Sequence, residues 1–166
     1  MKETTRKYIL LSLLIFVMVG FIVATVLANK QNQIFETEDF LYQQTIQLYQ
    51  AGNYTEAQSL IADLTIENGD SEMVNYLAGL IAANLGEYSA AAIYMQKTLD
   101  INPHNVEVPM FMLQFAEVLF SAERYADAKV VLERCKEWNW QPQDYPGYQE
   151  QVQGMLAQIE NIEQGR

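Results

Sequence analysis

The 34 residues from Glu72 to Asn105 decide the fold, and they read EMVNYLAGLIAANL, GEY, SAAAIYMQKTLD and INPHN. Apolar residues recur every three or four positions on both sides of Gly86, which predicts two amphipathic helices over 72–85 and 89–100. Pro103 ends the second helix, because proline lacks an N–H and clashes with the turn before it. Small residues such as Gly79 and Ala91 stand where the two helices must approach. The stretch therefore predicts a tight helical hairpin.

The turn Gly86-Glu87-Tyr88 of this hairpin recurs at two other places. Gly52-Asn53-Tyr54 lies 34 residues earlier in the chain, and Glu123-Arg124-Tyr125 lies 37 residues later. In each copy an alanine follows three positions after the tyrosine. The sequence therefore contains three related hairpins at nearly constant spacing.

This pattern resembles the tetratricopeptide repeat (TPR), a helix–turn–helix repeat of about 34 residues. The middle copy matches the family's signature positions at Gly79, Gly86, Tyr88, Ala91, Leu99 and Pro103. The first copy lacks the Leu-Gly pair and the closing proline; the third has Ala116 in place of glycine and follows an insertion at 106–108. The resemblance implies an all-α solenoid of about three TPR-like helix-turn-helix repeats, at about 38–71, 72–105 and 109–140.

A further helix is expected at 145–163, after a loop that contains Pro142. Its apolar residues lie three or four positions apart and form one stripe. They are Tyr148, Val152, Met155, Leu156, Ile159 and Ile162. Because a repeat array exposes an apolar face at each end, we predict a C-terminal capping helix that completes a domain over 38–166. The alternative is a detachable helix that docks on another protein.

The N-terminal part of the chain has a different character. Tyr8 to Ala28 is a run of 21 residues without a charge, and as a helix it would span about 30 Å, the thickness of a bilayer core. We predict that 8–28 is one transmembrane helix, a signal-anchor. The alternative is a cleaved signal peptide ending at Ala28, although the run exceeds the roughly 7–15 apolar residues of such peptides.

Charge around this run predicts its orientation. Lys2, Arg6 and Lys7 precede it, and only Lys30 follows before a long acidic stretch. The positive-inside rule then makes 1–7 a short cytoplasmic tail and 29–37 a juxtamembrane segment. The expected location is the cytoplasmic membrane of a bacterium, single-pass, with the TPR-like domain on the extracytoplasmic side, periplasmic or cell-surface.

Few residues could carry chemistry. Cys135 is the one cysteine and His104 the one histidine, and no metal-binding spacing occurs. We expect His104 to be solvated in a turn and Cys135 to be a buried, inert thiol. The net charge of −11 argues against a nucleic-acid partner. The sequence therefore predicts no enzyme, no metal site and no cofactor.

Binding to protein is a better expectation. The TPR resemblance implies a concave groove lined by the first helix of each repeat. The candidate groove residues are Tyr42, Ile46, Tyr49, Met73, Tyr76, Leu77, Leu80, Met110, Leu113 and Phe120, with the polar residues Asp39, Gln43, Gln50, Asn84, Gln114 and Glu117 beside them. Such a surface suits an apolar helix or extended segment. The alternative is that these residues pack against each other or against the final helix.

The groove positions also exclude one kind of ligand. TPR domains that bind the C-terminal tail of a chaperone clamp its carboxylate with Lys, Arg and Asn from this face. The matching positions here hold Tyr42, Ile46, Leu77, Met110 and Gln114. An acidic C-terminal tail is therefore not the expected ligand.

Charge is unevenly distributed along the predicted domain. From Gln31 to Gln96 there are nine acidic residues and no Lys or Arg, whereas the third repeat contains Arg124, Lys129, Arg134 and Lys136. The acidic part is either a solvated face or a surface that steers a basic partner.

Together these features predict a membrane-anchored TPR scaffold or accessory subunit of a membrane protein complex. Its partner would be another subunit of that complex or an exported polypeptide, with the bilayer contacted through Tyr8–Ala28. The alternative function is an extracytoplasmic, chaperone-like TPR protein that handles exported or apocytochrome-type clients.

Overall fold

The computed structural model describes residues 16–21, 23–25 and 37–165. The chain divides into two compact units, residues 1–41 and residues 42–166, the second of which we call the repeat unit. In the first unit, residues 16–21 and 23–25 are helical. No helix in the described ranges is both long and apolar enough to cross a membrane. Most of the predicted span Tyr8–Ala28, with its flanks 1–7 and 29–36, lies outside the described residues.

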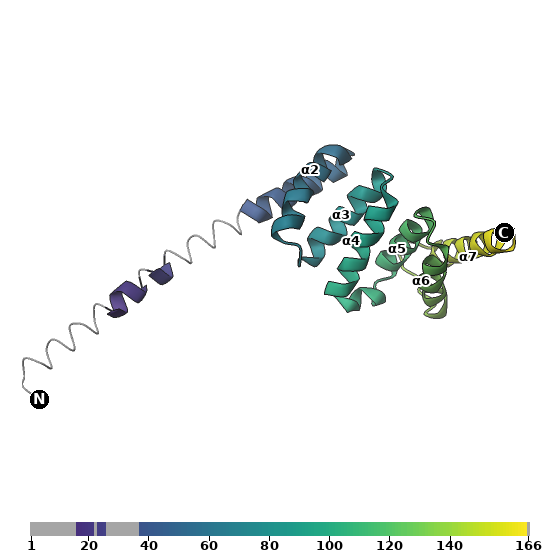
Figure 1. Cartoon of the computed structure of the whole chain (residues 1–166). Coiled ribbons are helices and arrows are strands. Elements are labelled where there is room, and N and C mark those ends of the chain that lie inside the picture. The colour runs from purple at the N-terminus through teal and green to yellow at the C-terminus, as the bar shows by residue number, and fades with distance from the viewer. Residues whose placement is uncertain (1–15, 22, 26–36, 166) are drawn as a thin grey trace, which may run out of the picture. The chain divides into compact units, whose positions relative to one another are not determined.

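The repeat unit consists of helices arranged as successive hairpins (Figure 1). A helix over residues 37–50 enters it. The elements that follow are α2 (Tyr54–Glu67), α3 (Glu72–Asn84), α4 (Tyr88–Ile101), the 3-10 helix η1 (Pro103–Glu107), α5 (Pro109–Ser121), α6 (Tyr125–Glu137) and α7 (Tyr148–Gln164). Helix α3 packs on α4, α5 packs on α6, and α7 packs on α6. The prediction of an all-α, TPR-like repeat domain is confirmed over this part of the chain.

The three turns between paired helices share one backbone conformation. Gly52 has φ 77°, Gly86 φ 78° and Glu123 φ 60°. In the second repeat the Glu87 N–H donates to the Ala82 carbonyl at 2.9 Å. In the third repeat the equivalent bond runs from the Arg124 N–H to the Leu119 carbonyl, also at 2.9 Å. Glycine adopts the left-handed region freely, whereas glutamate pays about 1–2 kcal/mol there. The positive φ angle explains why two of the three turns have glycine at this position. The third turn has Glu123 there instead.

A close approach of α3 and α4 explains the glycine in the middle of α3. A Cβ added at Gly79 would lie 2.9 Å from Cγ of Met95 and 3.5 Å from the carbonyl oxygen of Ala91. Met95 is itself fully buried. In the third repeat the equivalent position is Ala116, which is also fully buried.

The insertion before the third repeat forms part of η1. The Glu72 carboxylate at the start of α3 accepts hydrogen bonds from the side-chain amides of Asn102 and Asn105, both at 2.8 Å. Pro103 and Pro109 stand in the first turn of η1 and α5, where a missing N–H costs nothing. These two bonds hold η1 to the start of α3, and because η1 also contacts both α4 and α5, the segment connects the second and third repeats.

Helix α7 covers the end of the array. One face of it is buried, comprising Tyr148, Val152, Met155, Leu156 and Ile159. The Tyr148 hydroxyl donates to the Pro109 carbonyl at 3.0 Å, and Lys129 pairs with Glu163 at 2.9 Å. Helix α7 thus occupies the place of a cap in this structure.

Candidate protein-binding face

The candidate residues lie on the first helices of the repeats, and we call the solvent-facing side of these helices the A face. On α5 it comprises Met110, Gln114 and Glu117, which share one side because they are spaced four and three residues apart. The repeat spacing of 37 residues maps these onto Met73, Leu77 and Leu80 of α3. The remaining candidates are Tyr42, Ile46 and Tyr49 on the helix over 37–50, Tyr76 on α3, and Leu113 and Phe120 on α5.

The structure exposes some of these side chains and buries others. Met73 is 62% exposed and Met110 38%. Leu77 and Leu113 are buried, at 5% and 2% exposure, and belong to the core between helices. The other six candidates are half-buried, and they are Tyr42, Ile46, Tyr49, Tyr76, Leu80 and Phe120. Eight of the ten residues therefore remain accessible enough to touch a partner.

Aromatic packing and a hydrogen bond join α3 to α5 on the A face. The ring of Tyr76 lies 5.6 Å from that of Phe111, and its hydroxyl donates to Oε1 of Gln114. Burial raises the pKa of Tyr76, and the nearby Tyr49 raises it further. Tyr76 is therefore a neutral hydrogen-bond donor, and its side chain is held in place by the Phe111 ring and by Gln114. Phe120 instead packs edge-on against Tyr125, with ring centroids 5.3 Å apart.

A second hydrogen-bonded group links α5 to α7. Gln151 donates from Nε2 to Oε1 of Glu117 and accepts at Oε1 from the Tyr145 hydroxyl. Burial raises the pKa of Glu117, while the hydrogen bond from Gln151 lowers it. The A face therefore continues onto the final helix, with a half-buried carboxylate at the junction.

Sequence reasoning missed Gln151 and Tyr145, although a signal for Gln151 exists. Adding the 37-residue repeat spacing to Gln114 leads to Gln151. The same step maps buried positions of α5 onto buried positions of α7. Phe111, Phe115, Val118 and Leu119 correspond to Tyr148, Val152, Met155 and Leu156. Helix α7 is thus in the register of a fourth first helix, and its residues extend the A face.

The A face has no cation. Within residues 37–165 the Lys and Arg residues are Lys97, Arg124, Lys129, Arg134 and Lys136. They lie on α4, on α6 or at the N-cap of α6, and none lies on α3, α5 or the helix over 37–50. On α3 and α5 the A face is apolar and aromatic with a single carboxylate, Glu117.

The side chains that could bind a metal ion are dispersed over the described part of the chain. Among them, no three His, Cys, Asp or Glu side chains are grouped to hold a metal ion. His104 is exposed in η1. Cys135 is fully buried, and burial raises the pKa of its thiol, which keeps it in the unreactive protonated form.

Comparison with known proteins places the fold. No protein-family model and no curated protein matches the chain. The Yersinia enterocolitica type III secretion chaperone SycD, in complex with a peptide of the translocator YopD, aligns with a TM-score of 0.63 at 20% identity. This alignment covers 77% of the present chain and 95% of SycD.

Two other solved structures align similarly. PcrH in complex with the chaperone binding region of PopD gives a TM-score of 0.62 at 17% identity, over 77% of this chain and 94% of PcrH. The TPR2B domain of yeast Sti1, in its pHsp70 complex, gives 0.59 at 10% identity, over 75% of this chain and 97% of that one. These are structures of two chaperone complexes and of one TPR domain. At such identities the likeness concerns the fold, and the described repeat unit is TPR-like.

Proposed function

We propose that the A face binds an apolar segment of another protein, so that the chain acts as a protein-binding module without catalytic activity. The observation that carries this proposal is the exposure of Met73 on α3 and Met110 on α5, with the half-buried Tyr76 and Leu80 also on α3. Methionine adapts its shape to irregular apolar partners, and a row of such residues suits a helix or extended segment.

The absence of Lys and Arg from α3 and α5 limits the kinds of ligand that the A face can bind. A terminal carboxylate needs a Lys, Arg or comparable donor cluster, and α3 and α5 have neither Lys nor Arg. The carboxylate of Glu117 would repel a second one. The ligand is therefore an internal segment recognised by its side chains, and not an acidic C-terminal tail.

The solved structures support this mode of binding. SycD was determined with a peptide of the translocator YopD bound, and PcrH with the chaperone binding region of PopD. Their fold matches the present repeat unit over more than three quarters of the chain. A TPR-like unit of this size is thus large enough to receive a polypeptide segment.

The proposal places this module at a membrane. The uncharged run Tyr8–Ala28 and the basic residues before it favour a single-pass anchor with the repeat unit on the extracytoplasmic side. In that position the module would be a scaffold or accessory subunit of a membrane complex.

The second candidate is a chaperone-like role for exported or apocytochrome-type clients, and the likeness to a secretion chaperone favours it. The two roles differ in stoichiometry. A subunit purifies in mild detergent with one partner at a fixed ratio, whereas a chaperone captures many clients loosely. Crosslinking of the full chain in its membrane, followed by mass spectrometry, separates them.

Site-directed photo-crosslinking tests the A face itself. A photoreactive amino acid at Met73 should capture a partner, whereas the same group at Ile93, which is 66% exposed on α4, should not capture it. Tyr76→Ala combined with Leu80→Ala should abolish the Met73 product while the circular dichroism spectrum stays helical. Identical products from the two positions would contradict the proposal.

A further inference from the structure

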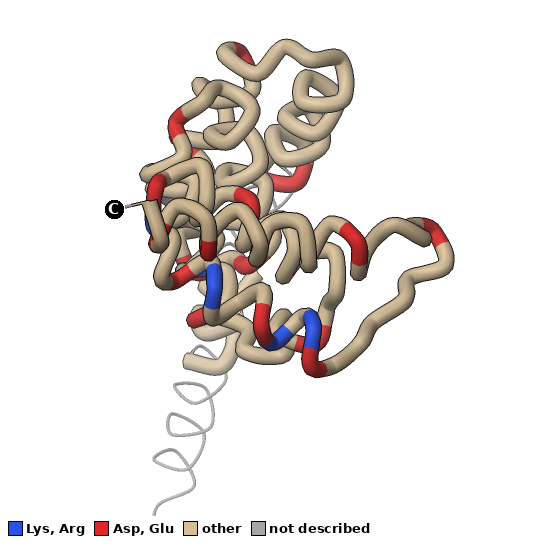
Figure 2. Tube along the Cα trace, turned by 90° about the vertical axis from the view of Figure 1, so that its right-hand side faces the viewer, with Lys and Arg blue, Asp and Glu red and all other residues tan. Residues whose placement is uncertain are grey.

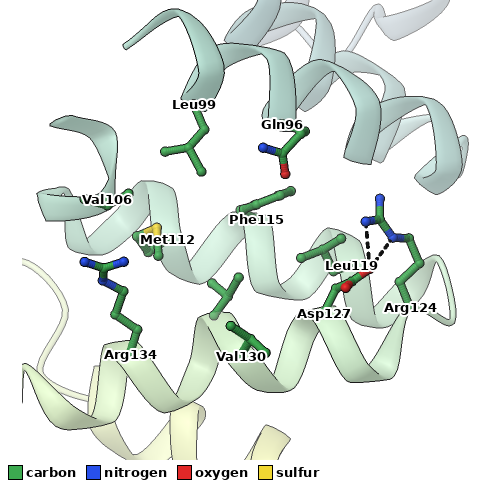
Figure 3. A pocket seen from close by; sticks show the side chains of 11 residues that line it. Gln96, Leu99, Val106, Met112, Phe115, Leu119, Arg124, Asp127, Val130 and Arg134 are labelled. Carbon is green, nitrogen blue, oxygen red and sulfur yellow. Dashed lines mark hydrogen bonds and ion pairs between the residues drawn. The ribbon is translucent and has the colours of Figure 1, made fainter. Parts of the chain in front are cut away.

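A hollow of about 280 Å³ lies between α4 and α6, with α5 as its floor (Figure 3). Its apolar lining comprises Leu99, Met112, Phe115, Leu119, Val130 and Val131. An α-helix has 3.6 residues per turn, so Met112, Phe115 and Leu119 point away from the side of α5 that carries Gln114 and Glu117. The hollow is therefore separate from the A face.

Charged side chains stand at both ends of this hollow. At one end Arg124 pairs with Asp127 at 2.7 Å, so that its charge is neutralised. At the other end Arg134 lies with its guanidinium carbon 4.7 Å from the centre of the Trp138 ring. Figure 3 shows the two arginines at opposite ends of the apolar floor. No ion pair joins Arg134 to a carboxylate within the described part of the chain. One positive charge at the rim is thus left for a ligand.

Arg134 is the positive charge of this region that favours an acidic group in a ligand. Of the five Lys and Arg residues within 37–165, four lie on α6 or at its N-cap, and they are Arg124, Lys129, Arg134 and Lys136. In Figure 2 the basic segments lie in one half of the helical unit, whereas acidic segments are spread over all of it. Helix α6 also carries Asp127, Glu133 and Glu137, and Arg124 and Lys129 are already paired with Asp127 and Glu163, so the attraction for an acidic group is local and centres on Arg134.

We infer that the hollow is a second docking site, which takes an acidic segment of a partner protein. One bulky apolar side chain of that segment enters over Met112 and Phe115. A neighbouring carboxylate pairs with Arg134, whose planar guanidinium can hold both oxygens. The volume of about 280 Å³ falls just below the roughly 300–1,000 Å³ of small-molecule sites, so the hollow fits one side chain better than a cofactor.

The location of the site has a structural consequence. Because the hollow and the A face lie on different sides of α5, both can be occupied at once. The chain would then join two polypeptides, one apolar on the A face and one acidic on α6. The second site does not depend on the proposed function of the A face.

Peptide binding to the purified full chain in detergent tests the inference. The probe is a fluorescein-labelled hexapeptide, Asp-Glu-Phe-Leu-Glu-Asp, followed by anisotropy, with Trp fluorescence reporting on Trp138 together with the adjacent Trp140. One matched peptide has Lys at all four acidic positions, and another has Ala at both apolar positions. We expect both controls to bind at least about tenfold more weakly, and binding of the acidic probe to weaken as salt rises.

Variants locate the probe on the structure. Arg134→Gln and Val130→Asp, the latter at a side chain that is 68% exposed, should each weaken binding at least about tenfold. Lys136→Gln on the same helix and Met73→Glu on the A face are the matched controls and should change binding less than about twofold. Unchanged circular dichroism shows that each variant is folded.

Several results would overturn the inference. Equal binding of the lysine peptide would remove the role of charge. Unchanged binding by Arg134→Gln, or loss of binding in Met73→Glu, would place the acidic peptide elsewhere. Self-association by light scattering that Val130→Asp abolishes would show that a second copy of the chain, and not a partner, occupies the hollow.

Discussion

The second and third repeats adopt the same backbone with different residues at their two most constrained positions. The second repeat has Gly79 at the close approach of its helices and Gly86 in the left-handed turn. The third has Ala116 and Glu123 at these positions, yet Glu123 takes φ 60° and closes the same turn. A turn with an unfavourable residue can thus form when the helices that it joins are held by other contacts.

The core around the third repeat supplies those contacts. Helix α5 buries Phe111, Phe115 and Leu119, and α7, which packs on α6, adds Tyr148 and Val152 to the same core. Fully burying one large apolar side chain contributes about 1.5–3 kcal/mol. Two or three such side chains outweigh the cost of about 1–2 kcal/mol at Glu123. We therefore expect the third repeat to depend on α7 and the second repeat to depend on its glycines.

The largest effect is expected from removing the main contact of α7. Tyr148→Ala should lower the free energy of unfolding by about 4 kcal/mol, because a fully buried aromatic side chain is replaced by a cavity. Hydrogen exchange should show that α5 and α6 lose protection before α3 and α4 do. Tyr148→Phe, which removes the hydroxyl that donates to the Pro109 carbonyl and also interacts with the Cys135 thiol, should cost about 1 kcal/mol. Equal loss of protection in both repeats would contradict the expectation that only the third repeat depends on α7.

The next effect concerns the second repeat. Gly79→Leu should destabilise the fold by about 3 kcal/mol, because the new side chain meets the buried Met95 and the backbone of Ala91. The matched change in the third repeat, Ala116→Gly, should cost only about 1 kcal/mol through helix propensity. Urea unfolding of both variants measures the difference. If Gly79→Leu were tolerated, the helices of the second repeat would not need their close approach.

A smaller effect of opposite sign is expected at the turn of the third repeat. Glu123→Gly should raise the free energy of unfolding by about 1 kcal/mol, because glycine relieves the left-handed strain. Gly86→Ala should lower it by a similar amount in the second repeat. Melting temperatures of the two variants and the parent should therefore fall in the order Glu123→Gly, parent, Gly86→Ala. If Glu123→Gly left the melting temperature unchanged, the turn of the third repeat would carry no strain.

The smallest effect links stability to pH. Burial raises the pKa of Glu117 in the folded state, so folding is favoured by its protonated form. Its contribution is present at low pH and is lost as pH rises through the folded pKa. Glu117→Gln should therefore be slightly more stable than the parent at pH 7, and this advantage should disappear as pH falls below about 4. Glu150→Gln, at an exposed residue of α7, is the control. An advantage that grew toward low pH would reverse the sign and contradict the burial of Glu117.

The candidate site was less predictable than the repeats. The spacing of Met73, Leu77 and Leu80 indicates one helix face, but spacing alone does not say that the neighbouring helix buries Leu77. The hydrogen bonds from Gln151 to Glu117 and from Tyr76 to Gln114 join positions 34 and 38 residues apart. No local pattern marks such pairs. Only the register of α7, visible through the 37-residue spacing, could have pointed to Gln151.

The sequence by itself determined the helical hairpins, the turn residues and the absence of cations from the first helices. These follow from the periodicity of apolar residues, from the φ angles open to glycine, and from the residue types themselves. The tertiary structure alone decided which apolar residues are core and which are surface, and it created the hollow at Arg134 from residues of three helices. The physical reason is that burial depends on the neighbouring helix, and this helix is chosen by the packing of the whole array.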